Sequence, residues 1–404
     1  MKFYDILIIG GGAAGFFTAI NCAEKNPKLK IAILERGKET LTKVRISGGG
    51  RCNVTHNCPE VSNLVKYYPR GEKELRSPFS VFSIKDTVTW FAAHKVKLKI
   101  EDDNRMFPVT DSSQTIIDCF LEAAKKLRID VFTSQSVQNI YPSEECWKVE
   151  TQDQKYSCEN LVFTTGSNPK MWDLLQELGH KIISAVPSLF TFNIKDARIK
   201  DLMGLATPAD VKVNGSKLSE SGPLLITHWG LSGPAILKLS AWGARELFDK
   251  NYQFSISVNW LDTINFEECV QELKTVKAND SKKLVRNRKA FDIPTRLWES
   301  LVSASSIPDD LKWADLSKQQ LNNLANELTN GQFEVRGKST FKDEFVTAGG
   351  IDLKQVNFKT MESKIHQKLY FAGEVLNIDA ITGGFNFQNA WTGGWIISEQ
   401  FKAI

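Results

Sequence analysis

The stretch from Asp5 to Glu35 decides the fold, reading D-I-L-I-I-G-G-G-A-A-G-F-F-T-A over residues 5–19 and A-I-L-E over 32–35. Its first apolar run, 6–9, is short, continuous and mostly β-branched, which is typical of a strand buried on both faces. An apolar helical pattern follows over 13–24, and a second short apolar run covers 31–34. The order strand, glycine-rich turn, helix and strand predicts a Rossmann-like βαβ unit.

Within this unit the glycines form the pattern G-x-G-x-x-G, and an acid follows Gly15 by 20 residues. The first glycine permits a tight turn, the second lets the backbone approach a pyrophosphate, and the third lets helix pack on strand. The helix N-terminus offers unpaired N–H groups to phosphates, and the acid is placed to bind a ribose. The predicted cofactor-binding residues of this stretch are Gly10, Gly12, Ala13, Ala14, Gly15, Glu35 and Arg36. This stretch alone leaves FAD and NAD both open.

Length and composition narrow the class of protein. A chain of 404 residues is long enough for two or three domains. Its hydrophobic content of 42% and charged content of 24% are ordinary for a globular protein, and a net charge of +4 favours no particular partner. No apolar run reaches the roughly 18–20 residues that span a bilayer, and the first run is too short for a signal peptide. Seven scattered cysteines without a C-x-x-C pattern do not predict a disulfide framework. We therefore expect a cytoplasmic protein with no membrane partner.

A second glycine-rich segment follows, reading K-V-R-I-S-G-G-G-R-C-N over 43–53. Three consecutive glycines bring backbone N–H groups within reach of an anion without side-chain obstruction, and the neighbouring cations add charge. We predict a second wall of the cofactor site, at the pyrophosphate or the flavin edge. Its members are Lys43, Gly48, Gly49, Gly50, Arg51, Cys52 and Asn53.

The next segments extend the sheet of the first unit. A strand at 97–100, a helix at 113–126 and a strand at 129–132 have the spacing of a further βαβ unit in a parallel sheet. Strands at 137–141, 147–151 and 156–158 predict an antiparallel meander, and the run 160–164 predicts another buried strand. Because ligands bind at the carboxyl ends of parallel strands, we predict that Thr165 and Gly166 contact the cofactor. Val137, at the start of the meander, is a further predicted cofactor-binding residue.

From about residue 188 the pattern changes to short strands, at 189–194, 210–213, 222–226 and 254–258, with a helix from 235 to 247. Residues 265–330 are predicted to be almost wholly helical, with Ser317 and Gln320 as a capping box. The basic run 282–289 is predicted to be a solvated helix face, with nucleic-acid binding as the alternative.

The end of the chain returns to the first pattern, because 368–374 again read as strand, glycine and acid. Two glycines then precede a predicted final helix over 388–401, whose N-terminus would favour the negative charge of a reduced flavin. The predicted cofactor-binding residues here are Gly373, Glu374, Gly383, Gly384, Phe385, Asn386, Phe387 and Gln388. The predicted domains are 1–187 with 346–404 for the cofactor, 188–262 with 332–345 as a β-rich insert, and 263–331 as a helical subdomain.

Three motifs together carry a resemblance: G-G-G-A-A-G at 10–15, S-G-G-G-R-C-N at 47–53 and A-G-E-V-L-N-I-D…T-G-G-F-N-F-Q-N-A-W at 372–391. The chain resembles the bacterial flavoproteins of the BaiN/YhiN type, which include an aminoacetone-oxidase branch and belong to the glutathione-reductase-like FAD superfamily. The resemblance covers almost the whole chain, including T-H-W-G-L-S-G-P at 227–234. It implies an α/β fold in which a Rossmann-like FAD domain holds one FAD non-covalently and carries a β-barrel-like plus helical insert. The loop after Gly166 is shorter here than in many relatives, so the resemblance does not carry over a substrate.

The function expected from these features is that of an FAD-dependent oxidoreductase acting on a small molecule. Two chemistries stay open: reduction of an enone-type C=C bond by transiently bound NAD(P)H, and oxidation of a small amine by O₂ with release of H₂O₂. A flavin-bearing sensor or an RNA-interacting protein is an alternative of another class, although nucleic acid is not the expected partner. His228 and Arg51 are the candidate catalytic residues, no metal-ligand spacing is present, and the oligomeric state is left open.

Overall fold

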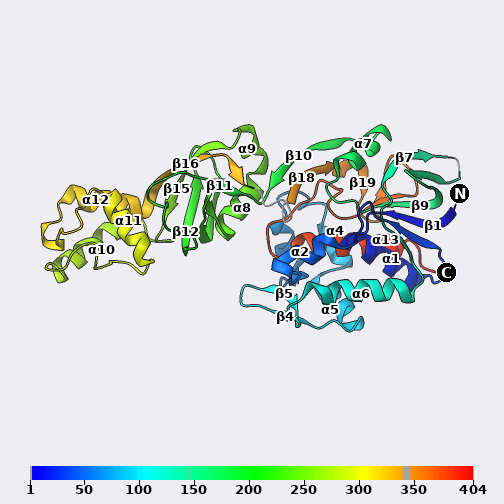
Figure 1. The fold of residues 1–404 in the computed structure, drawn as a ribbon, viewed down its shortest axis with the longest axis horizontal. Coiled ribbons are helices and arrows are strands. Elements are labelled where there is room, and N and C mark those ends of the chain that lie inside the picture. The colour runs from blue at the N-terminus through cyan, green and yellow to red at the C-terminus, as the bar shows by residue number, and fades with distance from the viewer. Residues whose placement is uncertain (1, 144, 340–345, 404) are drawn as a thin grey trace. The chain divides into compact units, whose positions relative to one another are not determined.

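The computed structural model describes residues 2–143, 145–339 and 346–403 (Figure 1). The chain forms two compact units, one of Met1–Val186 with Val346–Ile404 and one of Pro187–Phe345. The second unit is an insertion, since the chain leaves the first unit and later returns to it. The finer division of this insert at 262/263 and 331/332 stays a prediction. Among the described residues, no helix is both long and apolar enough to cross a membrane.

The first unit is built on a nine-stranded sheet in the order β19-β20-β21-β9-β1-β2-β6, with β8 and β7 attached beside β9. The pairs β21/β9, β9/β1, β1/β2 and β2/β6 are parallel, which confirms the predicted Rossmann-like core. Its strands are β1 (Lys2–Ile9), β2 (Ile31–Leu34), β6 (Asp130–Phe132), β7 (Val137–Pro142), β8 (Trp147–Thr151), β9 (Lys155–Phe163), β19 (Val356–Asn357), β20 (Glu362–Ser363) and β21 (Leu369–Phe371).

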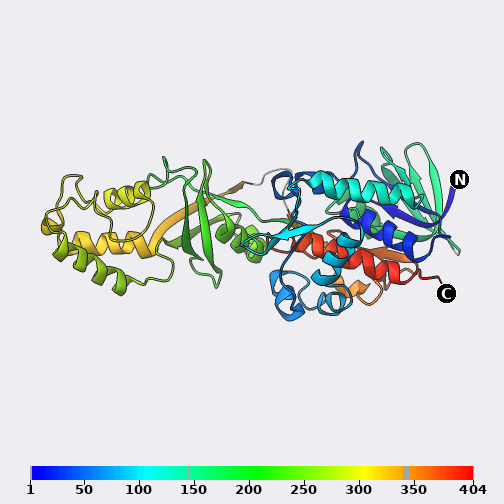
Figure 2. The same cartoon turned by 90° about the horizontal axis from the view of Figure 1, so that it is seen from below.

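The first and last long helices of the chain lie side by side on this sheet (Figure 2). They are α1 (Ala13–Lys25) and α13 (Phe385–Glu399). A Cβ at Gly394 would lie 2.8 Å from Thr18 Oγ1, so the glycine lets the two helices approach closely. The remaining helices of this unit are α2 (Thr42–Gly50), α3 (Val61–Leu64), η1 (Val65–Tyr67), α4 (Arg76–Val81), α5 (Ile84–Ala93), α6 (Ser113–Lys126), α7 (Pro169–Glu177) and η3 (Leu353–Gln355).

Two features of the predicted sheet are wrong. The strand predicted at 97–100 forms β4 (Leu98–Ile100), but it does not join the parallel sheet. It pairs antiparallel with β5 (Arg105–Pro108), which also pairs with β3 (Thr55–His56). The reason is a tight turn, in which Asn104 has φ +65° and Glu101 N donates to Arg105 O. In addition, the runs 156–158 and 160–164 form the single strand β9, which is long enough to join both the meander and the parallel sheet.

The second unit contains a seven-stranded antiparallel sheet in the order β16-β15-β12-β13-β14-β11-β17. Its first and last strands in this order, β16 and β17, are separated in sequence by Gly337 alone, so the sheet wraps around as a barrel does. Its strands are β11 (Thr191–Asn193), β12 (Ala206–Val213), β13 (Ser219–Ile226), β14 (Gly230–Ser232), β15 (Gln253–Asn259), β16 (Gly331–Arg336) and β17 (Lys338–Ser339). In the first unit, next to the points where the chain leaves it and returns, a separate two-stranded sheet pairs β10 (Ile182–Ser188) with β18 (Val346–Ile351).

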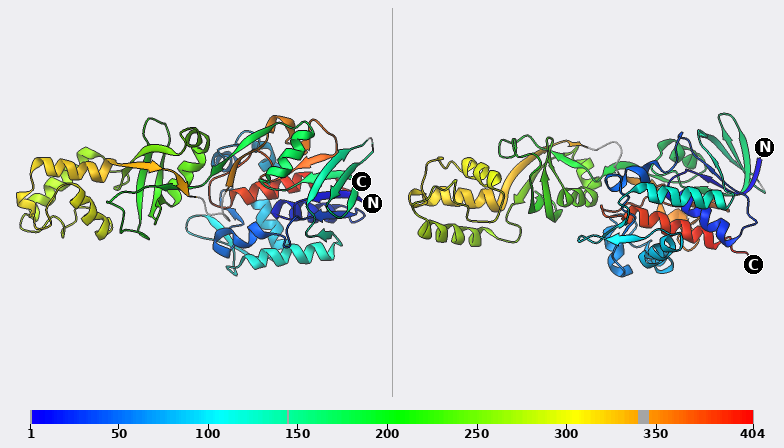
Figure 3. Two further views of the ribbon diagram at one scale, coloured as in Figure 1. Left: turned by 45° about the horizontal axis from the view of Figure 1, so that its top comes forward. Right: turned by 60° about the horizontal axis from the view of Figure 1, so that its bottom comes forward.

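The helical part of the insert consists of α10 (Phe266–Asn279), α11 (Thr295–Ala304) and α12 (Lys318–Asn330), with η2 (Trp313–Asp315). Figure 3 shows these helices packed together at one end of the sheet, where α12 leads into β16. The capping box of Ser317 and Gln320 is confirmed. The helix predicted over 235–247 is divided at Gly243 into α8 (Pro234–Trp242) and α9 (Ala244–Asp249).

His180 gives the first unit a predicted dependence on pH. It is buried, and its Nε2 lies 3.2 Å from Ser363 Oγ. Burial, with a smaller contribution from His366, lowers the pKa of His180 to about 4. Between this value and the ordinary pKa of about 6.5 the unfolded chain binds more protons than the folded chain, so stability falls as pH falls. Integrated over that interval, the loss is about 3 kcal/mol.

Urea unfolding at neutral and mildly acidic pH would measure this loss. We expect the variant His180→Gln to lose less stability on acidification than the original protein. Equal losses in the two proteins would contradict the assignment.

Candidate cofactor site

The turn between β1 and α1 has the geometry that a dinucleotide requires. Gly10 has φ +110°, and a Cβ there would lie 2.5 Å from Thr164 O. A Cβ at Gly15 would collide with the carbonyl oxygen of Gly10, whereas one at Gly12 would meet nothing within 4 Å. Within the described residues the helix N-terminus at Gly12 has no side-chain cap, which leaves N–H groups of its first turn for a ligand. This turn can therefore accept a pyrophosphate at Gly12.

A cleft lies beside this turn, at the carboxyl ends of β1 and β2. It brings together five predicted residues from four segments: Gly10, Glu35, Arg36, Val137 and Thr165. The Glu35 carboxylate is fixed, because it accepts from Gly11 N at 2.8 Å and from Gly37 N at 2.7 Å. The Thr165 hydroxyl is buried and has no hydrogen-bond partner among the described residues. A carboxylate with lone pairs left to accept and an unpaired hydroxyl fit the adenosine half of a dinucleotide.

The next predicted residues lie around the start of α1. Lys43 Nζ lies 2.5 Å from Glu374 Oε2. A Cβ at Gly166 would lie 3.7 Å from the same carboxylate oxygen, and one at Gly373 would lie 3.3 Å from Ala14 Cβ. Segments that are far apart in sequence therefore meet beside the predicted pyrophosphate position.

The glycine run follows a kink at Ser47 in α2, and its backbone is not helical. Gly48, Gly49 and Gly50 have φ of +58°, +68° and +84°, and a Cβ at either of the last two would meet nothing within 4 Å. Cys52 is buried, and burial raises the pKa of its thiol to about 12, so the thiol stays neutral and is no nucleophile. The open backbone of the run leaves room for a ligand.

Hydrogen bonds join this segment to the start of α13. The amide oxygen of Asn53 accepts from Gly384 N at 3.0 Å, and its amide nitrogen donates to Thr55 O at 2.9 Å. Thr55 Oγ1 donates to Gln388 Oε1 at 2.7 Å. The last helix begins at Phe385 rather than at the predicted residue 388, because Gly384 takes φ +88° and turns the chain into it. The second and third glycine segments thus form one continuous surface.

The other members of the last segment hold its shape. Asn386 Oδ1 accepts from Ala380 N at 3.0 Å, which closes the loop before the helix. Phe387 stacks on Trp391 with ring centroids 5.5 Å apart. Phe385 is buried, and Tyr68 donates its hydroxyl hydrogen to Phe385 O at 2.6 Å.

Two side chains beside this segment were not predicted from the sequence. His56 Nδ1 lies 3.2 Å from Gly383 O, and its ring lies 4.6 Å from the ring of Phe385. The ring of Tyr67 stacks on the ring of Phe385, with centroids 4.4 Å apart. The position of His56, three residues after Asn53 in the glycine-rich motif, is the signal that could have identified it.

The two candidate catalytic residues lie in different units. Arg51 Nη1 lies 2.6 Å from Glu101 Oε1 and 3.4 Å from Asp111 Oδ1, and its guanidinium covers the ring of Phe107 at 4.0 Å. Glu101 and Asp111 raise the pKa of Arg51, because they pair with its guanidinium within the first unit. His228 is exposed on a turn of the insert. Their catalytic roles stay predictions.

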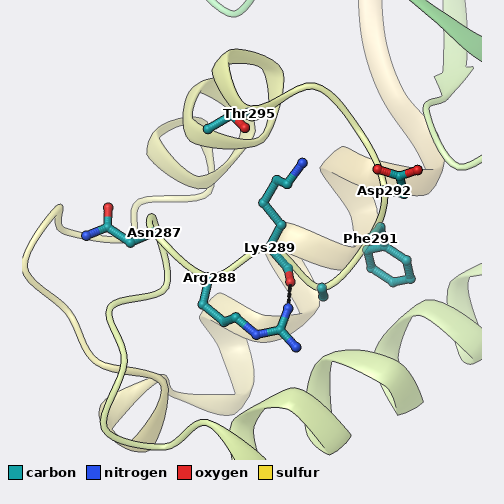
Figure 4. A pocket seen from close by; sticks show the side chains of 7 residues that line it. Asn287, Arg288, Lys289, Phe291, Asp292 and Thr295 are labelled. Atoms are coloured by element: carbon teal, nitrogen blue, oxygen red, sulfur yellow. Dashed lines mark hydrogen bonds between the residues drawn. The ribbon is translucent and has the colours of Figure 1, made fainter.

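A hollow of about 480 Å³ opens in the helical part of the insert (Figure 4). It contains the end of the basic run, which is not a helix face as predicted, because 280–294 form turns between α10 and α11. The Arg288 guanidinium turns back onto the Lys289 carbonyl, and Lys289 Nζ donates to Ile293 O at 2.6 Å. Arg288 and Lys283 also pair with Asp280. The basic run is thus largely neutralised by its own surroundings.

The chain is similar to known proteins over its whole length. A family model described as HI0933-like protein Rossmann domain matches residues 4–400. A ribosomal RNA dihydrouridine synthase of Escherichia coli (strain K12) is 28% identical over 416 residues, which cover 100% of this chain and 99% of the relative. A 3-dehydro-bile acid delta(4,6)-reductase of Clostridium scindens is 23% identical and covers 96% of this chain and 97% of the relative.

Among solved structures, 3-ketosteroid delta1-dehydrogenase from Sterolibacterium denitrificans superposes with a TM-score of 0.52 at 10% identity and covers 100% of both chains. That likeness shows a shared fold. The predicted resemblance is confirmed by the family match, and the chain belongs to the HI0933-like family of Rossmann-domain proteins, which makes it an FAD-dependent oxidoreductase.

Proposed function

We propose that this enzyme reduces a carbon–carbon double bond conjugated to a carbonyl, and that its substrate is the C5=C6 bond of uracil in RNA. One observation carries the proposal. The E. coli dihydrouridine synthase aligns with both units of the chain, so the insert is shared as well as the cofactor domain. The name of the bile-acid reductase indicates that it, too, reduces carbon–carbon double bonds near a carbonyl. The proposed substrate is therefore RNA and not the small molecule that the sequence favoured.

The residues of the first unit support this chemistry. When bound, FAD supplies the hydride that is added to the double bond. Glu35 and Thr165 would hold its adenosine half, Gly12 its pyrophosphate, and the surface of 48–53 with 383–388 its flavin half. Each of these segments meets a requirement of the cofactor: an acceptor for a ribose, an open backbone for phosphate, and a helix N-terminus for negative charge.

The second hydrogen must arrive as a proton, and His56 and Tyr67 are our candidates to deliver it. Both side chains are half-buried, and both lie against Phe385 at the predicted flavin end. Histidine changes its protonation near neutral pH, which suits a proton donor. NAD(P)H is proposed as a transient reductant.

A defined assay tests the proposal. Purified yellow protein is mixed with NADPH or NADH, and the flavin band is followed by stopped flow. The same protein is then incubated with reductant and ribosomal RNA transcribed in vitro, and the nucleosides are analysed by mass spectrometry. We expect the flavin band to bleach, and one uridine to gain the mass of two hydrogens only when reductant is present.

Other outcomes would contradict RNA as the substrate. Reoxidation of the bleached flavin by a steroid enone, without change in the RNA, would favour the small-molecule reductase. Failure of NAD(P)H to bleach the flavin, with peroxide formed from primary amines in air, would favour the amine oxidase. A colourless protein that cannot be reconstituted with FAD would exclude all three.

A further inference from the structure

The turn 227–230 of the insert displays an unusual side chain. Trp229 is 57% exposed, the highest fraction among the large apolar side chains in the described part of the chain. Most tryptophans here are buried, as Trp260, Trp298 and Trp313 are. A single exposed apolar residue needs no explanation by itself, so the inference depends on how the turn is built and on what surrounds it.

The backbone of the turn is fixed although the indole is uncovered. Thr227 N donates to Gly230 O at 2.8 Å, and Trp229 N donates to Thr227 Oγ1 at 3.2 Å. Ile194 N donates to Trp229 O at 2.8 Å, which attaches the turn to the chain after β11. Gly230 has φ +143°, and a Cβ there would lie 2.5 Å from Ile194 N, so only glycine lets the turn lie this close. A flat ring held on a rigid backbone binds a partner with little loss of side-chain entropy.

The neighbours of the turn complete a surface for a flat, negatively charged partner. Gly204 N donates to Ile226 O at 2.9 Å, which brings the exposed Met203 to one side. Lys195 follows Ile194 and is exposed, as is His228. The nearest carboxylate on this segment, Asp196, is already paired with Arg198. Proteins use an exposed aromatic ring to stack a base of single-stranded nucleic acid and a nearby ammonium group to contact its phosphate.

We propose that Trp229 is a stacking platform for a base of single-stranded RNA, with Lys195 as its phosphate contact. This inference rests on the proposed function and names the part of the insert that holds the RNA. It also replaces the basic run 282–289 as the RNA-binding element, because Lys283, Arg286 and Arg288 of that run are paired with carboxylates.

The test uses the full-length FAD-loaded protein and a fluorescein-labelled single-stranded oligouridylate, with binding followed by fluorescence anisotropy. Stacking of one base on an aromatic ring is worth about 1–3 kcal/mol, so Trp229→Leu is expected to weaken binding about 5- to 150-fold. Trp229→Phe should recover much of the loss. Trp242→Leu, which removes a 40% exposed tryptophan from α8 of the same unit, is the matched control and should bind as the original protein does.

The dependence of RNA affinity on salt concentration distinguishes base stacking from phosphate contact. Trp229→Leu should leave unchanged the slope of the logarithm of the binding constant against the logarithm of the salt concentration. Lys195→Gln should make that slope less steep by about one, because one phosphate contact is lost. Thermal unfolding midpoints of the variants check that each is folded.

The outcomes distinguish this inference from the proposed function. Binding by Trp229→Leu within twofold of the original protein, or no binding by the original protein, would overturn the stacking platform. Tight binding that depends on Trp229, in a protein that forms no dihydrouridine, would retain the platform and overturn the proposed reaction. Dihydrouridine formation with an unchanged KM in Trp229→Leu would retain the reaction and overturn the platform.

Discussion

Replacing Gly15 with alanine is expected to give a destabilised protein that purifies without flavin. The added methyl group would collide with the Gly10 carbonyl oxygen and lie 2.9 Å from Thr164 Oγ1, and neither α1 nor β1 can yield without losing contacts on the sheet. Overpacking of this kind typically costs about 1–3 kcal/mol, and a collision with backbone belongs at the upper end. Urea unfolding measures the stability, and the ratio of flavin to protein absorbance measures FAD content.

The matched control is Gly12→Ala in the same turn. A Cβ there meets nothing within 4 Å, and the backbone at φ −93° and ψ −166° is one that alanine adopts readily. We expect the free energy of unfolding of the apoprotein to stay within about 0.5 kcal/mol of the original, because the site is not packed. FAD content should nevertheless fall, since the methyl group occupies the approach to the pyrophosphate.

The two variants test different statements. A Gly15→Ala protein with an unchanged midpoint would contradict the close packing of α1 on β1. A Gly12→Ala protein that binds FAD as tightly as the original would contradict the placement of the pyrophosphate.

The first βαβ unit could be predicted from sequence because its determinants are local. The buried run 6–9, the glycines of the turn and the run 31–34 each fix a backbone conformation within a few residues. The parallel pairing of Ile6 with Ile31 then follows from the connection itself. The same reasoning predicted the insertion, since a second strand–glycine–acid pattern at 369–374 must return to the sheet where the first unit lies.

Features that depend on distant partners could not be predicted in this way. The strand at 98–100 has a local pattern that suits either sheet, and only its hairpin with 105–108 decides the outcome. The basic run looks like a helix face in sequence, but its charges turn toward carboxylates such as Asp280 and Asp309 that fix it in turns. The hydrogen bonds from Gly384 N to Asn53 and from Thr55 to Gln388 join segments more than three hundred residues apart, so no local pattern shows that they meet.

The loop before α13 gives the second large effect, because it is held by a buried ion pair. Asp379 is fully buried, and the Arg70 guanidinium binds its carboxylate through two nitrogens. The same segment is attached again at Ile381, whose N–H donates to Tyr67 O at 3.1 Å. We expect Arg70→Met to lower the free energy of unfolding by about 3–5 kcal/mol, since it leaves a buried carboxylate without its cation. Urea unfolding monitored by far-UV circular dichroism measures this loss.

Two further variants decide whether the loss comes from the unpaired charge. Arg76→Met removes an exposed arginine that pairs with Glu72, both side chains being largely in solvent, and should cost no more than about 0.5 kcal/mol. The double variant Arg70→Met with Asp379→Leu removes the buried charge together with its partner and should recover part of the stability that the single variant loses. The single variant Asp379→Leu completes this comparison. If the loss of stability in the double variant equals the sum of the losses in Arg70→Met and Asp379→Leu, the pair is not coupled and Arg70 stabilises the loop through its other contacts. If the pair is coupled, flavin affinity should follow stability across the series, because the loop that Arg70 holds leads directly into the residues proposed to bind the isoalloxazine ring.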